Sequence, residues 1–177
     1  TGNTIERANS RGIDMYSWNS TVENNVIRDV GVIANLGTSG MGCGIADYVN
    51  SCTDDGIGIR VKVGAQDVYG FTGNTNTIQY NRLENIAYHG LDISGYANTV
   101  YRNVIDTPCA FKGDCAGVHS YGNDNLSTTP LFDLTVRENF ILDSYGNRDG
   151  SPAAFYTLMG YGLFFDNLNE IAKERLD

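Results

Sequence analysis

Residues 76–121 read NTIQYNRLENIAYHGLDISGYANTVYRNVIDTPCAFKGDCAGVHSY and contain one phrase twice. The phrase is threonine, an aliphatic residue, two variable residues, asparagine, one variable residue and an aliphatic residue, and its copies begin 22 residues apart at Thr77 and Thr99. A second phrase, glycine followed by an aliphatic residue and then alternating polar and apolar residues, begins after each copy at Gly90 and Gly117. Short phrases that recur at a period of about 20 residues are typical of repeat proteins.

Both phrases recur outside this stretch. Further copies of the threonine phrase, the last with alanine in the asparagine position, are residues 21–27, 135–141 and 4–8. Further copies of the glycine phrase begin at Gly12, Gly56 and Gly162. In two cases the glycine precedes the next threonine phrase by nine residues, from 12 to 21 and from 90 to 99. This offset predicts a repeating unit of two strands.

The asparagine of the threonine phrase is expected to mark a turn. Successive asparagines are separated by 56, 22 and 36 residues at Asn25, Asn81, Asn103 and Asn139, so loops of different length are expected between similar units. In a coil of parallel strands stacked about 4.8 Å apart, like residues lie above like. We therefore expect these four asparagines to form a ladder, in the left-handed backbone that asparagine tolerates.

Short alternating strands, turns rich in glycine and asparagine, and the lack of an apolar pattern at helical spacing predict an all-β protein. An antiparallel sandwich also has many short strands, but it does not explain a recurring phrase with one asparagine held in place. On these phrases the chain resembles, over most of its length, the right-handed parallel β-helix proteins, which include pectate lyases and polygalacturonases. The resemblance implies a single solenoid domain over residues 1–177, with about five turns of helix and inserted loops.

The two ends of the chain have no recognisable cap. A solenoid needs caps, because an open end exposes unpaired strand edges and apolar core. We therefore expect a fragment of a longer β-helix, or end-to-end stacking with another chain.

Composition restricts the partners. The net charge is −9 and the pI is near 4.5, which argues against a nucleic-acid partner and against an anionic membrane surface. No apolar run approaches the length of a membrane span. A uronic-acid polysaccharide is not excluded if the few cations cluster on one face.

The four cysteines form two local pairs, Cys43 with Cys52 and Cys109 with Cys115, in or beside glycine-rich loops. Their spacing matches no zinc motif, and neither loop contains histidine. Two disulfides and an extracellular or periplasmic location are predicted. The alternative is four reduced, buried cysteines.

The polar residues of the glycine phrase are expected to face outward, because side chains alternate along a strand. Aligning the five copies on their glycines predicts a first outward column of Asp14, Gly58, Asp92, His119 and Phe164. It predicts a second column of Tyr16, Arg60, Ser94, Tyr121 and Asp166, with Lys62 one step further along its strand. Aromatic rings stack on sugars while charges and hydroxyls fix their register. The strip is therefore predicted to bind polysaccharide; the alternative is that its residues are polar because outward positions meet solvent.

Asp92 and His119 are the leading catalytic candidates. As neighbours about 5 Å apart in one column, the carboxylate can orient the imidazole for general-base work. Asp14 and Asp92, two units apart and so about 9–10 Å, fall at the wide end of the separation for an inverting glycosidase. Asp166 is a third carboxylate candidate.

A lyase would use the strip differently. Arg60, Lys62 or His119 would neutralise a uronate and remove its C5 proton, and Tyr121 would serve as acid. The residues expected to bind substrate are Tyr16, Lys62, Lys112, Phe164 and Asp166, with Lys112 projecting over the strip from the loop before His119.

Two local segments resemble polygalacturonases: Asp54-Asp55-Gly56-Ile57-Gly58-Ile59 and Tyr88-His89-Gly90. The resemblance implies that Asp55 is an acid and His89 an assisting residue. The chain departs from the family pattern where Tyr88 replaces a glycine, and its Arg-x-Lys triplet precedes His89 instead of following it. Calcium bridging is common among the pectate lyases that the fold resembles; Asp54 and Asp55 are the candidate ligands, and a plain turn is the alternative.

The sequence thus predicts an extracellular protein that binds and cleaves a polysaccharide, as a lyase or a glycoside hydrolase. The alternative is a non-catalytic structural or adhesive segment of a surface or filament protein.

Overall fold

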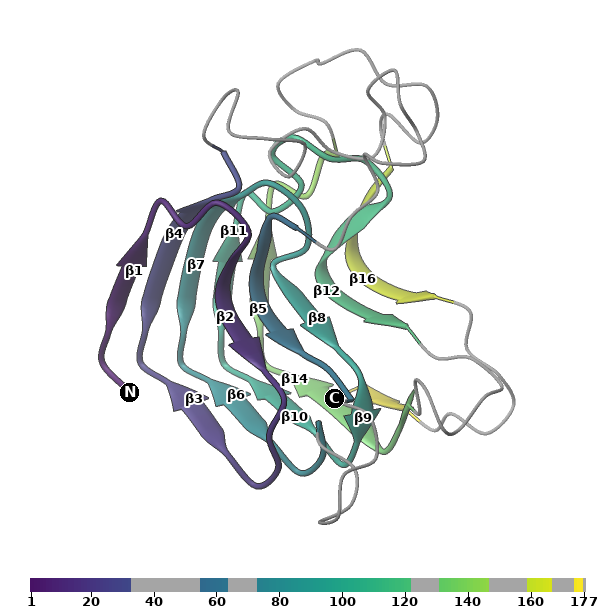
Figure 1. The fold of residues 1–177 in the computed structure, drawn as a ribbon. Helices are drawn as coiled ribbons and strands as arrows, with labels where there is room; N and C mark the ends of the chain where they lie inside the picture. The colour runs from purple at the N-terminus through teal and green to yellow at the C-terminus, as the bar shows by residue number, and fades with distance from the viewer. Residues whose placement is uncertain (33–54, 64–72, 122–130, 147–158, 167–173, 177) are drawn as a thin grey trace.

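The computed structural model describes residues 1–32, 55–63, 73–121, 131–146, 159–166 and 174–176 (Figure 1). The regular secondary structure in this part of the chain consists of β-strands alone. All strand pairs are parallel. The prediction of an all-β protein is confirmed.

Three five-stranded sheets carry almost all of these strands. Sheet A contains β1 (Thr4–Glu6), β4 (Val26–Val30), β7 (Arg82–Ile86), β11 (Val104–Asp106) and β15 (Phe140–Leu142). Sheet B contains β2 (Arg11–Met15), β5 (Ile57–Val61), β8 (Leu91–Ile93), β12 (Cys115–Tyr121) and β16 (Gly160–Asp166). Sheet C contains β3 (Thr21–Glu23), β6 (Thr77–Gln79), β10 (Thr99–Tyr101), β14 (Leu134–Arg137) and β17 (Glu174–Leu176). A small sheet pairs β9 (Gly95–Tyr96) with β13 (Leu131–Phe132).

The chain visits the three sheets in a fixed order, A then B then C, and then returns to A. Each strand pairs with strands of the previous and following circuits, as β7 does with β4 and β11. The colours of Figure 1 therefore run from the N-terminal to the C-terminal strand across each sheet. The repeating unit has three strands, so the predicted unit of two was wrong. The threonine phrase itself contains two strands, one in sheet C and one in sheet A, with its asparagine at the corner between them.

The predicted asparagine ladder is present at this corner. The amide oxygen of Asn81 accepts hydrogen bonds from the backbone N–H and the side-chain Nδ2 of Asn25, at 3.1 and 2.9 Å. Asn103 and Asn139 repeat the pattern, each accepting two bonds from the asparagine of the preceding circuit. The left-handed backbone lies one residue earlier than expected, at Asn24, Tyr80, Arg102 and Glu138, with φ between 50° and 56°.

The alignment of residues 4–8 with the threonine phrase was wrong. β1 pairs with β4, with Thr4 opposite Val26, so these residues match the second half of the phrase. Asn3, and not Ala8, therefore occupies the asparagine position: its backbone N–H and its Nδ2 both donate to the amide oxygen of Asn25, at 3.0 and 3.1 Å.

The core lies between the three sheets and is built from stacked aliphatic side chains. Ile27 from sheet A, Ile59 from sheet B and Ile78 from sheet C are fully buried in one cluster. The glycine of the glycine phrase is required by this packing. A Cβ at Gly90 would lie 2.5 Å from Ile105 Cγ2 and 2.6 Å from the carbonyl oxygen of Gly117. Gly12, Gly58 and Gly117 face the same restriction against Ile27, Leu83 and Ile141.

The register of sheet B corrects the predicted columns. Ile59 pairs with Ile13 and with Leu91, so Gly58, and not Gly56, is the counterpart of Gly12 and Gly90. Gly58 packs against Leu83, whereas Gly56 lies in the turn before β5 with φ 83°. The shift of two residues puts Arg60 in the first column in place of Gly58, and Lys62 in the second in place of Arg60.

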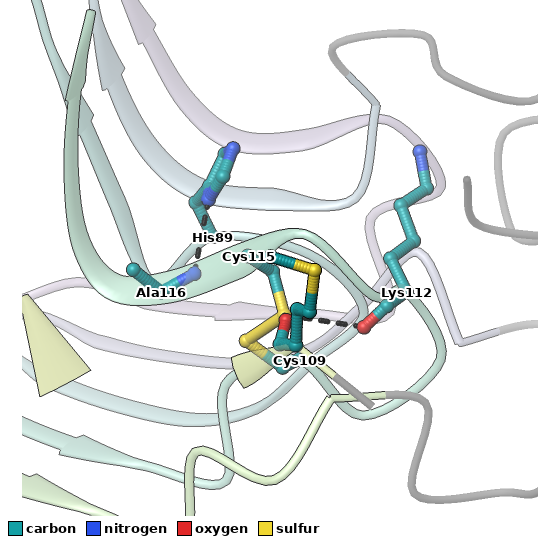
Figure 2. The surroundings of a disulfide bond; sticks show 6 residues. His89, Cys109, Lys112, Cys115 and Ala116 are labelled. Carbon is teal, nitrogen blue, oxygen red and sulfur yellow. Dashed lines mark hydrogen bonds between the residues drawn. A yellow bond between two sulfur atoms is a disulfide. The ribbon is translucent and has the colours of Figure 1, made fainter. Parts of the chain in front are cut away.

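One of the two predicted disulfides lies in the described residues. Cys109 and Cys115 are bonded, with their Cα atoms 5.7 Å apart (Figure 2). Cys43, Cys52 and Asp54 fall outside the described residues. The described strands and turns include no helix with the length and hydropathy needed to cross a membrane.

Candidate functional site

The first outward column of sheet B is a continuous row of unlike residues. The strand register places Asp14 beside Arg60, Arg60 beside Asp92, Asp92 beside His119 and His119 beside Phe164. Parallel stacking brings each side chain next to those of the neighbouring circuits. The row divides into two groups, one around Arg60 and one around His119.

Asp92 and His119 form the hydrogen-bonded pair that the sequence predicts. His119 Nδ1 lies 2.8 Å from Asp92 Oδ1, and both residues are more than nine-tenths buried. A carboxylate accepts hydrogen bonds, so Nδ1 carries the proton and Nε2 has a free lone pair in the neutral ring. Lys62 Nζ lies 3.9 Å from the other carboxylate oxygen of Asp92. Asp92 thus fixes the orientation of the His119 ring and the tautomer in which Nε2 can accept a proton.

This pair lies in the wall of a cavity of about 240 Å³. The residues lining it are Lys62, Tyr88, His89, Asp92, Asp114, His119, Tyr121, Phe164 and Asp166. Six of these residues belong to the strip that the sequence predicts: Lys62, Asp92, His119, Tyr121, Phe164 and Asp166. The residue before β12, the second half of β12 and the end of β16 all contribute to this wall. Both strands are curved (Figure 1).

His89 is held neutral beside His119. Its Nδ1 accepts a hydrogen bond from the backbone N–H of Ala116 at 3.2 Å, so the ring proton is on Nε2 (Figure 2). The two imidazoles stack with centroids 4.0 Å apart and an interplanar angle of 4°. Burial, with further contributions from His119, Lys112 and Lys62, holds the pKa of His89 well below its usual value of 6.5. His89 therefore presents an N–H donor, and not a cation, near the cavity.

The other group of the row is a separate cluster. Arg60 donates to both carboxylate oxygens of Asp14, at 2.8 Å each, and to the hydroxyl of Tyr16 at 3.0 Å. None of these three residues lines the cavity in the described part of the chain. The predicted partnership of Asp14 with Asp92 across one water is not formed here, because the guanidinium of Arg60 stands between their positions in the row and binds Asp14.

Lys112 and Asp55 are engaged elsewhere. Lys112 is fully buried, and its ammonium lies 4.7 Å from the centre of the Tyr88 ring instead of projecting over the strip. Asp55 accepts a hydrogen bond from the Ser10 hydroxyl and lies 3.7 Å from Arg11. Among the described residues no group of three histidine, cysteine or acidic side chains could hold a metal ion. Because Asp54 lies outside the described residues, the calcium site at Asp54 and Asp55 stays a prediction.

Two residues of the cavity were missed or misjudged from the sequence. In the segment Lys112-Gly113-Asp114-Cys115 the sequence analysis selected Lys112, whereas Asp114 lines the cavity. Burial first, and then the like charge of Asp166, raise the pKa of Asp114 above its usual value of 3.8, against a smaller lowering by His119. Tyr88 was named only in comparison with a polygalacturonase motif. One signal was available: the chain has two histidines, and both line the cavity.

Comparisons of the chain with protein-family models, with curated proteins and with solved structures find no match. The function must therefore be argued from the residues themselves. Chemically, the cavity combines an oriented base, a neutral N–H donor, a lysine and two further carboxyl groups. That set is suited to proton transfer on a bound molecule.

Proposed function

We propose that the chain is a right-handed parallel β-helix whose sheet B binds an extended polysaccharide and cleaves it in the cavity by acid–base chemistry. The fixed order in which the chain visits three parallel sheets supports the β-helix. A protein of this kind presents a long, regular outer face, which suits a polymer better than a compact ligand.

The observation that carries the catalytic part is the bond between Asp92 and His119 at the cavity wall. With Nδ1 held by Asp92, His119 Nε2 is the atom available to take a proton. The proton would come from water if the reaction is hydrolysis, or from C5 of the sugar if it is elimination on a uronate. The general acid then protonates the glycosidic oxygen as its bond to carbon breaks.

Aromatic residues support sugar binding at the same place. Phe164 packs 5.5 Å from His119 and 4.6 Å from Tyr161, measured between ring centroids. Tyr88 and Tyr121 add two more rings with polar ends. Rings of this kind stack on the apolar faces of sugars while their hydroxyls form hydrogen bonds. Tyr16, with 54 % of its surface exposed, extends the aromatic strip beyond the cavity.

An extracellular location fits the Cys109–Cys115 disulfide, since such bonds persist in oxidising compartments. The partner would be a polysaccharide, and not a nucleic acid, because the net charge is −9.

The test is an incubation of the protein with a panel of neutral and uronic-acid polysaccharides, with and without calcium. New reducing ends report cleavage of either kind, and absorbance near 235 nm reports elimination alone. The wild type and Asp133→Asn should cleave the same polymer, since Asp133 is exposed and lies outside the cavity. His119→Ala should lose the activity. Saccharide binding without cleavage would point to the structural or adhesive segment instead.

A further inference from the structure

Two carboxyl groups in the cavity are not used by the Asp92–His119 pair. Asp114 directly precedes β12, and Asp166 is the last residue of β16. Within the described part of the chain neither forms a hydrogen bond or an ion pair. Both are partly buried in a wall that also contains aromatic rings and imidazoles, so they belong to a built cavity and not to a patch of surface charge.

A second observation points to a ligand in this cavity. His89 has only 3 % of its surface exposed, and its Nδ1 is occupied by the Ala116 amide. The ring proton is therefore on Nε2, and the residue lines the cavity. A sugar hydroxyl or ring oxygen in the cavity would accept a hydrogen bond from this N–H.

The backbone fixes Asp114 firmly in place. Its φ is 53°, and the next residue, Cys115, is held by the disulfide to Cys109 and by a hydrogen bond from its N–H to the carbonyl oxygen of Met159 at 3.1 Å. The backbone from which the Asp114 side chain starts is therefore held in one place beside the cavity.

The charges in the cavity argue against a uronate. Its described lining contains three carboxyl groups but one lysine, Lys62, which lies 3.9 Å from Asp92. A sugar carboxylate would therefore meet the Asp166 carboxyl group, and the described lining offers no cation besides the lysine that already faces Asp92. Like charges brought together in a partly desolvated site oppose binding. A sugar without a carboxylate meets no such opposition.

We propose that Asp114 is the general acid of a glycoside hydrolase whose substrate in this cavity is a polymer of neutral sugars. This inference rests on the proposed function and specifies its reaction and substrate. The Asp114 proton passes to the glycosidic oxygen as the bond from that oxygen to C1 breaks. Water forms the new bond to C1 and gives its proton to His119 Nε2. Solvent then carries that proton from His119 back to Asp114, which restores both groups.

The environment of Asp114 agrees with this role. Burial and the nearby Asp166 raise its pKa, so Asp114 holds its proton to higher pH than an ordinary aspartate. The other groups that face the cavity are Lys62, His89, Asp92, His119 and the two tyrosines, 88 and 121, with Lys112 buried behind Tyr88. Of these groups, His119 lowers the pKa of Asp114, but the net effect of all contributions is a raised pKa. A carboxyl group whose pKa is raised is the usual general acid of glycosidases.

The first experiment compares substrates that differ only in charge. The wild type is assayed on neutral polymers, namely glucan, galactan, xylan and mannan, and on polygalacturonate beside the same polymer with its carboxyl groups reduced to alcohols. We expect reducing ends from a neutral polymer, no rise at 235 nm, and a preference of about tenfold or more for the reduced polymer if either member of the pair is cleaved. Cleavage of a uronate polymer with rising absorbance would overturn the inference while the proposed function stands. No cleavage of any polymer would overturn both.

The second experiment tests the role of Asp114 by its leaving-group dependence. Asp114→Asn should lower kcat on the neutral polymer by about 10²–10⁴-fold, while it retains most activity on the corresponding 4-nitrophenyl glycoside, whose leaving group needs no proton. Asp133→Asn is the matched control and should behave as wild type on both. Equal losses on both substrates would show a structural role and contradict the inference.

The third experiment uses the pH profile of the same reaction. Activity needs protonated Asp114, so it should fall as pH rises through the pKa of that group. Asp166→Asn removes the charge that raises this pKa, and the alkaline limb should therefore move to lower pH. An unchanged alkaline limb in a folded Asp166→Asn variant, together with full activity of Asp114→Asn, would remove Asp114 from the mechanism.

Discussion

The asparagine ladder and the row of residues on sheet B are built on the same stacked circuits but use them in opposite ways. At the corner between sheets C and A every circuit supplies the same residue, and each asparagine bonds the next. On sheet B adjacent circuits supply different residues, in the order Asp14, Arg60, Asp92, His119 and Phe164. At the corner, the repeated asparagine forms hydrogen bonds with backbone groups of the neighbouring circuits. On sheet B, the change of residue from circuit to circuit places side chains of different chemical type next to one another.

The comparison teaches where to look for function in a repeat protein. A repeated residue is explained by the stacking itself, because a ladder of identical side chains saturates its own hydrogen bonds. A position that changes from circuit to circuit is free of that requirement. Asp92 and His119 occupy equivalent positions on adjacent strands, and only their difference makes an acid–base pair.

The largest effect should follow from breaking the varied row. Asp92→Asn keeps the shape of the side chain but no longer holds the proton on His119 Nδ1 as a carboxylate does, so cleavage should slow by about 10²–10⁴-fold. Reducing-end assays on the polymer that the wild type cleaves measure this. The variant should unfold in urea at nearly the wild-type midpoint. A fully active Asp92→Asn would mean that the pair is structural.

The next largest effect should follow from breaking the repeated ladder. The Asn81 side chain takes part in four hydrogen bonds, with Asn25 (two), Val22 and Asn103. At about 1 kcal/mol for each, Asn81→Ala should lower the free energy of unfolding by about 3–5 kcal/mol. Asn3→Ala, at the exposed end of the ladder, should cost less than about 1 kcal/mol. Urea unfolding of both variants gives the comparison, and equal costs would contradict the role of the ladder.

A smaller effect is expected from the glycine positions of sheet B. In Gly90→Ala the new Cβ would meet Ile105 and the Gly117 backbone, and overpacking of this kind costs about 1–3 kcal/mol. Gly162→Ala is the control, since no atom of the described residues lies within 4 Å of the corresponding Cβ. Thermal unfolding should separate the two. If both alanines are tolerated equally, the glycines do not set the register of sheet B.

The smallest effect concerns pH and His89. Its pKa is lower in the folded protein than in the unfolded chain, so between those two values the unfolded state binds more protons. Stability therefore falls as pH drops below about 6.5 toward the folded pKa. His89→Asn keeps an acceptor for the Ala116 amide but cannot take up the proton. The variant should lose less in Tm than the wild type between pH 7.5 and pH 5, and parallel losses would show that His89 is not held neutral.

Much of the fold could be predicted from the sequence, because stacking repeats the phrases that specify it. The asparagine spacing predicted the ladder, and the glycine phrase predicted that Asp92 and His119 are neighbours. The phrase did not identify which glycine of Gly56 and Gly58 packs against Leu83, since both precede an isoleucine. That choice depends on contact with sheet A, and it moved Arg60 and Lys62 by one column.

The site was harder to predict than the fold. Lys112 and Asp114 are two residues apart in one short loop, and local pattern does not tell which of them is buried. The packing of Lys112 behind Tyr88, and the turn that directs Asp114 to the cavity, depend on circuits that are distant in sequence.

The most direct test of the cavity as a saccharide site is a ¹H–¹⁵N spectrum of the imidazole rings. The chain has two histidines, and both line the cavity, so the spectrum contains two sets of ring signals. Titration with oligosaccharides from the neutral panel should shift both sets with one dissociation constant, and should do so less in Phe164→Ala. If no oligosaccharide shifts either ring at saturating concentration, the cavity is not where a polysaccharide is bound and cleaved.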